Sequence, residues 1–557
     1  LLYFWSDIGI KQIWICPELN YAAAVHADKW IPILPNTDAA MQLAIIYTWI
    51  TEGTYDKDYV ATHAIGMDKI EAYVLGKEDG VPKTPEWASP KCGVPEWTIK
   101  ALAREFGSHI TTIAHGGGGG MIRGPYSHEP CRLESILLGM QGLGGPGVHQ
   151  YWTGTGKPRA DVPEAARLPI KGMQAKDGPP MVVGPIDAPI RLCNLFGQFT
   201  GFCNTKQFIP KTLIQDAILD PPITFWGTGA IQEHASGQFI KYTYPIAEEE
   251  GGTEIHMIWM DNPCRTTCWN DGNRTMAAMR SPKIECIVAQ HQWLENDCLA
   301  ADLILPVSTQ IELNDICTNS RFGEDIQSGS LQRQAIEHVG ESKSDYEIIL
   351  EVAQKLGVVE EVSEGRSIEE WIQYMFQEGY KFADSVSWEE FDENHYFCFP
   401  TVSDWHQDPP GLRLFYDDPD EHPLTTPTGK LEFCSSALER FFPDDPERPP
   451  IPKWIERGET HDERISGDRA KDYPLLMMSN HPKWRMHAQC DDIPWTRELP
   501  TCKVRGNDGY MYEPLWMNPE TAAEREIENG DIVKAYNERG AVLCGAFVTE
   551  RMMPGVA

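Results

Sequence analysis

Hydrophobic and polar positions in the first part of the chain alternate between two periods. Short apolar runs at residues 13–16, 30–33 and 110–114 predict strands. Residues 39–50 carry apolar side chains at helical spacing with Gly53 beyond their end, which predicts a helix. Two more helices are expected at residues 94–103 and 129–141. Alternating strands and helices are typical of an α/β domain.

The same rhythm returns after residues 150–250, a stretch rich in Pro and Gly. Strands are predicted at residues 255–260, 284–288 and 302–305, and a helix at 274–280. Strand, loop and helix units of this length indicate a parallel, doubly wound sheet.

From Tyr473 the pattern changes to short strands separated by tight turns. Strands are predicted at residues 475–478, 532–536 and 541–549, and Asn529-Gly530-Asp531 is a turn. This end of the chain therefore predicts a small β-barrel.

Four parts follow from these patterns and from a length of 557 residues. They are an α/β domain at 1–155, a second α/β domain with a loop-rich insertion at 156–384, an acidic, Pro-rich surface connector at 385–470 and an incomplete β-barrel at 471–557.

Charge and composition exclude some partners. Asp and Glu number 82 against 48 Lys and Arg, which gives a net charge of -34. This argues against nucleic acid and anionic membranes as partners, because phosphate binding needs a basic face. A nucleotide cofactor stays possible, since backbone N–H groups and a few side chains can hold it. No apolar run reaches the length of a membrane span, about 18 residues.

The 15 cysteines include no CxxC pair, so we expect mostly reduced, buried thiols. The chain begins with Leu1 and stops inside an apparent barrel segment, so we expect a fragment.

Asn36-Thr37-Asp38, directly before the first long helix, has two interpretations. Thr37 can cap the helix while Asp38 complements its dipole. Alternatively, the Asp38 carboxylate accepts the paired N–H groups of a guanine edge, because an ionised Asp only accepts hydrogen bonds.

Five consecutive glycines at 116–120 follow the third strand. They form either a flexible loop or a phosphate cradle, because glycine lets backbone N–H groups approach an anion. Arg123, with Tyr126 close behind, would suit a pyrophosphate.

Two later segments carry polar side chains at strand ends. Asn262 ends a strand, where ligands bind in open α/β sheets, although an Asn-Pro turn is also a common structural feature. Ser479, His481 and His487 follow another strand and could bind a polar heterocycle, and Asn518 could add an amide.

In order along the chain, six segments resemble the molybdopterin enzymes of the dimethyl sulfoxide reductase family. They are Ala27-Asp28-Lys29-Trp30 with Asn36-Thr37-Asp38-Ala39-Ala40, Cys92-Gly93-Val94-Pro95, Met140-Gln141-Gly142 with Gly145-Pro146-Gly147, Ala301-Asp302 with Leu305-Pro306 and Glu312, Asn529-Gly530-Asp531, and Arg539-Gly540. Asn36 stands where that family usually has Gly.

The resemblance implies Rossmann-like domains and a six-stranded double-psi-type β-barrel around a bis(molybdopterin guanine dinucleotide) with molybdenum or tungsten. The implied cofactor contacts are Asp38 at one guanine, Gly117, Gly118, Arg123 and Asn262 in the dinucleotide crevice, and Ser479, His481, His487 and Asn518 at the pterin or diphosphate. In this family the metal ligand precedes the part matched here, so the resemblance assigns no residue of this chain to the metal.

Within the family, the resemblance is greatest to a branch that moves hydroxyl groups between phenols. It implies hydroxyl or oxygen-atom transfer on a small phenolic substrate and an iron-sulfur electron-transfer small subunit as partner. Candidate catalytic residues are His481, His487, Tyr126 and Arg321. A sulfur or arsenic oxyanion reductase and a catalytically silent subunit of a respiratory complex are the alternatives.

Overall fold

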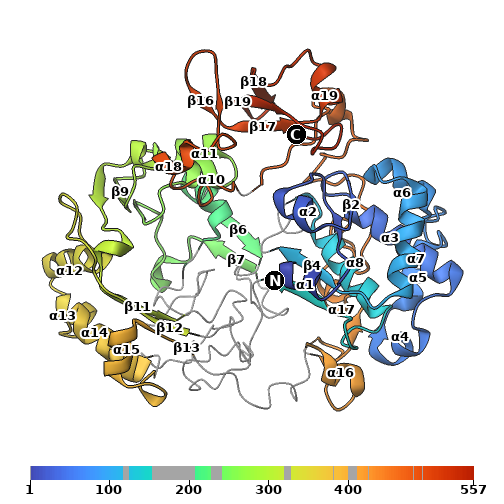
Figure 1. Ribbon diagram of the computed structural model, residues 1–557, viewed down its shortest axis with the longest axis horizontal. Coiled ribbons are helices and arrows are strands. Elements are labelled where there is room, and N and C mark those ends of the chain that lie inside the picture. The colour runs from blue at the N-terminus through green and yellow to red at the C-terminus, as the bar shows by residue number, and fades with distance from the viewer. Residues whose placement is uncertain are drawn as a thin grey trace. The chain divides into compact units, whose positions relative to one another are not determined.

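The computed structural model describes residues 2–116, 124–153, 207, 209–226, 241–318, 328–379, 382–398, 411–424, 426–480, 482–491 and 493–557 (Figure 1). The chain forms two compact units. Unit 1 comprises Leu1–Thr153, Asp408–His481 and Trp495–Ala557, and unit 2 comprises Gly154–Gln407 and Pro482–Pro494.

Unit 1 combines a helical group with several small sheets. Its helices are α1 (Leu2–Asp7), α2 (Tyr21–His26), α3 (Asp38–Glu52), α4 (Lys57–His63), α5 (Met67–Val74), α6 (Pro85–Cys92), α7 (Glu96–Ser108), α8 (His128–Gly139), α16 (Arg413–Asp417), α17 (Ser436–Phe441) and α19 (Pro519–Ala523), with a 3-10 turn at Asp468–Lys471 and α18 (Pro494–Arg497) at a unit boundary. Its strands are β1 (Ile13–Ile15), β2 (Lys29–Ile31), β3 (Ala64–Ile65), β4 (Ile113–Gly116), β5 (Gln150–Thr153), β14 (Leu431–Glu432), β15 (Val504–Arg505), β16 (Met511–Tyr512), β17 (Pro514–Met517), β18 (Ile532–Asn537) and β19 (Gly540–Val548).

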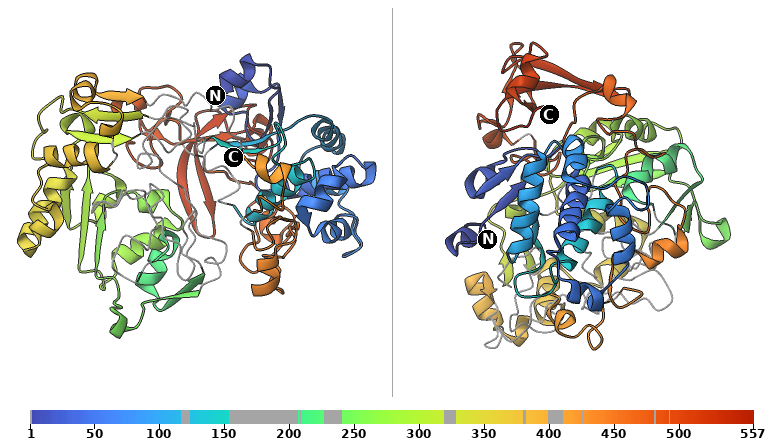
Figure 2. Two further views of the ribbon diagram at one scale, coloured as in Figure 1. Left: turned by 90° about the horizontal axis from the view of Figure 1, so that it is seen from below. Right: turned by 90° about the vertical axis from the view of Figure 1, so that its right-hand side faces the viewer.

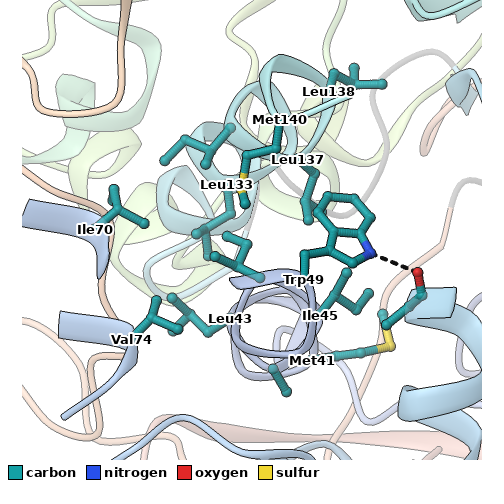
Figure 3. Packing of buried hydrophobic residues seen from close by; sticks show 14 of the residues in the cluster. Met41, Leu43, Ile45, Trp49, Ile70, Val74, Leu133, Leu137, Leu138 and Met140 are labelled. Atoms are coloured by element: carbon teal, nitrogen blue, oxygen red, sulfur yellow. Dashed lines mark hydrogen bonds between the residues drawn. The ribbon is translucent and has the colours of Figure 1, made fainter. Parts of the chain in front are cut away.

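Helix α3 is the centre of the core of unit 1. It confirms the helix predicted at 39–50, and it ends at Gly53, whose φ of 69° is the left-handed geometry that glycine favours. Helices α5, α6, α7 and α8 pack around it; they are the blue and cyan helices of Figure 2. Trp49 is fully buried, and its indole N–H donates to the carbonyl of Ala103 at 2.6 Å (Figure 3).

The stretch that we expected to be a surface connector contributes to this core. Strand β14 pairs in parallel with β3, so that Leu431 lies opposite Ala64. Phe433 is 2% exposed and packs so close to Gly139 that a Cβ there would lie 2.8 Å from its ring. The low apolar content of this stretch therefore gave no indication that a few of its side chains are deeply buried.

The C-terminal strands form small sheets. β19 pairs in parallel with β17 and antiparallel with β18, and β15 pairs antiparallel with β16. The strand predicted at 475–478 was wrong as a strand: it forms an isolated bridge between Leu476 and Val556, and the N–H groups of Leu476 and Met478 donate to the carbonyls of Gly555 and Ala557. The closed barrel stays a prediction.

Unit 2 contains two larger sheets. Its helices are α9 (Ile214–Leu219), α10 (Arg265–Cys268), α11 (Gly272–Met279), α12 (Asp345–Leu356), α13 (Val359–Ser363), α14 (Ile368–Tyr374) and α15 (Trp388–Asn394), with 3-10 turns at Lys211–Leu213, Glu248–Glu250, Asn296–Ala300, Gln310–Glu312 and Phe382–Asp384 and a π turn at Met375–Gly379. Its strands are β6 (Ile223–Trp226), β7 (Lys241–Tyr244), β8 (Met257–Met260), β9 (Cys286–His291), β10 (Leu303–Pro306), β11 (Asp315–Thr318), β12 (Ser328–Gln332) and β13 (Tyr396–Cys398).

Strands β8, β9 and β10 form a sheet in the order β10-β9-β8, and both pairings are parallel. This confirms the parallel strands predicted at 255–260, 284–288 and 302–305, while the doubly wound order stays a prediction. Strands β11, β12 and β13 form an antiparallel sheet over a second core that includes Phe376 and Phe391. None of the described helices has both the length and the apolar character needed to cross a bilayer.

Candidate cofactor site

Several predicted site residues lie outside the described part of the chain. These are Gly117, Gly118, Arg123, Arg321 and His481. Asp38, Tyr126, Ser479 and Asn518 belong to unit 1, and Asn262 and His487 belong to unit 2.

Asp38 is the first residue of α3, and Thr37 is at the N-cap as predicted. The Thr37 hydroxyl, however, donates to the carbonyl of Leu34 at 2.6 Å and does not cap the helix. The simple capping interpretation therefore fails for Thr37, although Asp38 still lies in the first turn, where its charge complements the helix dipole.

The Asp38 carboxylate is partly buried and has no donor from another residue in the described part of the chain. Loss of solvation raises its pKa to about 6, and the negative charge of Glu134 adds to this effect. A hydrogen bond from its own backbone N–H acts in the opposite direction, and the charges of His115 and Arg464 add smaller effects of the same sign. Asp38 thus offers an acceptor that the described fold leaves open, at the first turn of a helix.

A hydrogen-bonded pair of a partly buried histidine and a buried glutamate lies near Asp38. His115 Nε2, at the end of β4, is 2.6 Å from Glu134 Oε2 on α8, and Glu134 is 3% exposed. Gln150 Nε2 donates to the same oxygen at 3.0 Å. Glu134 raises the pKa of His115. We had not singled out these residues from the sequence; the available signal was a histidine directly before the glycine run.

Arg464 also reaches the start of α3. Its Nη1 donates to the carbonyl of Asn36, and its Nε donates to the carbonyl of Ile455 at 3.2 Å. Burial lowers its pKa to about 10. Because 428 positions separate Arg464 from Asn36, no local pattern in the sequence could have indicated this contact.

Tyr126 is buried, with a positive φ of 55°. Its hydroxyl lies 2.8 Å from Glu447 Oε1 and 3.1 Å from the carbonyl of His461. Burial and Glu447 raise its pKa to about 12. The phenol is therefore bound within unit 1, and its catalytic role stays a prediction.

Ser479 and Asn518 have different surroundings. Ser479 is exposed, and the next residue, Asn480, donates to Glu18 Oε1 at 2.7 Å. Asn518 caps α19 by accepting from the N–H of Glu520 at 2.9 Å, and its Nδ2 donates to the carbonyl of Met552 at 2.7 Å. The fold thus uses both ends of the Asn518 amide, whereas Ser479 remains available to a ligand.

In unit 2, Asn262 follows β8 and is exposed. The N–H groups at the start of the next helix, α10, bind a side chain of the protein. The carboxylate of the fully buried Asp297 accepts from the N–H groups of Arg265 at 2.6 Å and Thr266 at 3.2 Å. These donors are therefore occupied. The side-chain amide of Asn262 makes no hydrogen bond within the described part of the chain and is the group left for a ligand.

His487 lies in a loop that packs against α10. Its Nδ1 is 3.8 Å from the thiol of Cys268, and the loop is anchored where the N–H of Cys490 donates to Glu295 at 2.7 Å. Ser479 and His487, which are expected to bind the same heterocycle, belong to different units: Ser479 to unit 1 and His487 to unit 2.

These residues fit the guanine dinucleotide that the resemblance implies. Guanine presents neighbouring N–H donors, which match the open Asp38 acceptor, while Asn262 and Ser479 offer exposed polar groups. No group of three or more His, Cys, Asp or Glu side chains suited to a metal ion occurs among the described residues.

Comparison with known families identifies two domains. Residues 242–355 match the molybdopterin oxidoreductase domain, and residues 475–557 match the molydopterin dinucleotide binding domain. Both matches fall within segments that the structure describes in large part.

Curated relatives match almost the whole chain. The pyrogallol hydroxytransferase large subunit of Pelobacter acidigallici is 33% identical over 99% of this chain. Trimethylamine-N-oxide reductase of Haemophilus influenzae and the dimethyl sulfoxide/trimethylamine N-oxide reductase of Rhodobacter capsulatus are 30% and 31% identical, each over 98% of the chain. The chain spans 60% to 66% of the length of these relatives.

Among solved structures, acetylene hydratase from Pelobacter acetylenicus matches 99% of this chain and 66% of its own, with a TM-score of 0.58 and 17% identity, which indicates a shared fold. The domain matches imply a bis(molybdopterin guanine dinucleotide) cofactor with molybdenum or tungsten. The chain therefore belongs to the molybdopterin oxidoreductases, the family that also includes the dimethyl sulfoxide and trimethylamine N-oxide reductases.

Proposed function

We propose that the complete protein is the catalytic subunit of a molybdenum or tungsten enzyme that transfers a hydroxyl group or an oxygen atom on a phenolic substrate. The observation that supports this most is the 33% identity to pyrogallol hydroxytransferase over 99% of the chain. The open polar groups at Asp38, Asn262 and Ser479 support the cofactor contacts that such an enzyme needs.

The cofactor and the protein have different roles in this proposal. When bound, the metal supplies oxygen-transfer chemistry, and the protein binds and orients the reactants. In this proposal Asp38 accepts hydrogen bonds from one guanine, while Asn262 and Ser479 bind the dinucleotide or pterin. The glycine run with Gly117, Gly118 and Arg123 is proposed as part of the diphosphate cradle.

His487 is the proposed acid or base for the phenol. A phenolic hydroxyl needs a hydrogen-bond partner that can take or give a proton, and an imidazole does this near neutral pH. His487 is exposed and is held in a left-handed turn with a φ of 54°. His481, Arg321 and Tyr126 are further candidates for contacts with the substrate.

The substrate proposal is tested by an anaerobic assay of the full-length protein against phenols, trimethylamine N-oxide, dimethyl sulfoxide, and sulfur and arsenic oxyanions. We expect turnover of a catechol- or resorcinol-type compound. Replacing His487 by Asn should lower kcat by about 100-fold or more. His256→Asn is the matched control, because His256 is exposed and pairs only with Glu285 at 3.3 Å among the described residues.

A reductase is the second candidate. Reductases of N-oxides and sulfoxides are 30% to 31% identical to the chain, almost as similar as the hydroxytransferase. Activity confined to the N-oxide, the sulfoxide or the oxyanions would overturn the phenol assignment and leave the cofactor assignment intact. Complete inactivity of a metal-free protein would favour the silent-subunit alternative.

We also propose an iron-sulfur small subunit as the electron-transfer partner. The relative from Pelobacter acidigallici is named as a large subunit, which supports a multi-subunit enzyme. Affinity purification of the full-length protein from its native cells, followed by iron analysis, tests this. A complex free of iron would contradict it.

A further inference from the structure

Arg464 is a buried cation held in a fixed orientation near the start of α3. It is 9% exposed, and its guanidinium lies 4.0 Å from the ring centre of Trp454. Its Nε binds the carbonyl of Ile455, and its Nη1 binds the carbonyl of Asn36, two residues before Asp38. A guanidinium held by stacking and two carbonyls cannot reorient freely, so its charge stays beside the turn.

Asn36 joins this turn to a third segment. Its φ of 65° lies in the left-handed region, and its Nδ2 donates to the carbonyl of Pro125 at 2.8 Å. Gly124 leaves room for that amide, since a Cβ at Gly124 would lie 2.1 Å from it. The carbonyl and the side chain of Asn36 thus connect the start of α3 to Arg464 and to the segment around Pro125.

The charges near Asp38 come from several elements. Cys16, Cys92 and Cys131 each have a pKa of about 11, so these thiols are neutral near pH 7. Glu134 opposes the Asp38 charge but is paired with His115. Arg464 has a pKa of about 10 and is charged near pH 7. Among the described residues its guanidinium donates to two backbone carbonyls and to no carboxylate, so its charge near Asp38 is not paired.

We propose that Arg464 is a positioning residue for cofactor recognition. It fixes the turn at Asn36, and its charge favours an ionised Asp38 carboxylate, which can accept hydrogen bonds from the N–H groups of guanine. This rests on the proposed contact between Asp38 and guanine. Protonated Asp38 would place a donor against those donors, so cofactor retention should depend on pH in a way that Arg464 controls.

The test measures cofactor retention by the full-length holoenzyme. Protein is incubated between pH 5 and pH 8, passed through a desalting column and analysed for GMP after acid hydrolysis. The wild type should lose GMP as the pH falls below the cofactor-free Asp38 pKa of about 6, because bound guanine donors favour the ionised carboxylate. Arg464→Gln should raise the midpoint, because it removes an opposite charge that favours the ionised form of Asp38.

Two further variants separate charge from structure. Arg464→Lys keeps the charge and should restore most of the wild-type profile. Arg448→Gln removes the positive charge of an exposed arginine that pairs with Asp445, and it should leave the profile unchanged. Folding of each variant is checked by circular dichroism at pH 8. If Arg464→Gln does not fold, the Lys variant decides: a raised midpoint despite the retained charge would overturn the proposal.

The remaining outcomes are distinct. If wild-type protein contains GMP but Arg464→Gln shows the same midpoint, Arg464 has no positioning role and the proposed function stands. If full-length wild-type protein contains no GMP at pH 8, the proposed function fails and this inference fails with it.

Discussion

Asp38 shows how the surroundings of one residue decide between two interpretations of the same motif. The sequence allowed either a helix-start residue or a ligand for guanine. In the structure the carboxylate is partly buried, receives no donor from another described residue, and has a pKa raised to about 6. A partly buried carboxylate with no donor from another residue is less costly when a ligand supplies one. Its surroundings therefore favour ligand binding.

Asp38→Asn should empty the guanine site without weakening the fold. The amide would face guanine donors with its own donor, at a cost of about 1–3 kcal/mol, which corresponds to roughly 5- to 150-fold weaker binding. Because the raised pKa shows that the fold disfavours the ionised carboxylate, stability of the cofactor-free protein above pH 6 should stay the same or rise. GMP analysis and urea unfolding measure the two effects. Full GMP content together with a small loss of stability would support the helix-start interpretation instead.

The Glu312 carboxylate should make the folding stability of unit 2 depend on pH. Its carboxylate accepts from the N–H and hydroxyl of Thr309 and from the N–H of Val339, each at 2.6 Å. These bonds lower its pKa from 4.5 to about 2. The stabilisation is therefore complete above pH 4.5 and is lost as the pH falls towards 2.

Glu312→Gln should accordingly be less stable than wild type at pH 7, and the difference in unfolding free energy should shrink between pH 4.5 and pH 2. Urea unfolding followed by tryptophan fluorescence measures it. Glu337→Gln, an exposed neighbour, is the control and should match wild type throughout. A difference independent of pH would show that hydrogen-bond geometry, and not ionisation, stabilises this turn.

At the scale of elements, β14 and the residues after it complete the core around α3. Phe433 packs against Gly139 at the end of α8 and is 2% exposed. Phe433→Ala should therefore destabilise the protein by about 3–5 kcal/mol, since it leaves a cavity in a close-packed core. Thermal unfolding should show a lower Tm. Phe441→Ala, at a side chain that is 45% exposed, is the comparison, and an equal effect of both changes would contradict this packing.

Elements with strong local signals were predictable. The apolar spacing and Gly53 predicted α3, and short apolar runs predicted β8, β9 and β10. The burial of Phe433 was not predictable, because its acidic, Pro-rich surroundings are typical of surface. Likewise, the places of Asp38 and Asn262 at helix and strand ends are enough to propose them as ligand contacts, whereas Arg464 gives no such signal because its partner Asn36 is distant in sequence. Local sequence patterns indicate periodicity and helix capping, but they do not indicate contacts between residues that are distant in the sequence.

At the scale of the whole molecule, each unit carries part of the proposed cofactor contacts. Asp38 and Ser479 belong to unit 1, and Asn262 and His487 belong to unit 2. The family's cofactor contains two dinucleotides, and the assignment of these four residues to them stays a proposal. The 48 Lys and Arg are outnumbered by 82 Asp and Glu, so we expect backbone and amide donors to contribute to anion binding.

The most direct test of this account is the ratio of GMP to metal in the full-length protein. Pure protein is hydrolysed in acid, GMP is quantified by chromatography, and molybdenum and tungsten are measured by mass spectrometry. The account predicts two GMP for each metal ion. Pure, full-length protein that contains no GMP would contradict it.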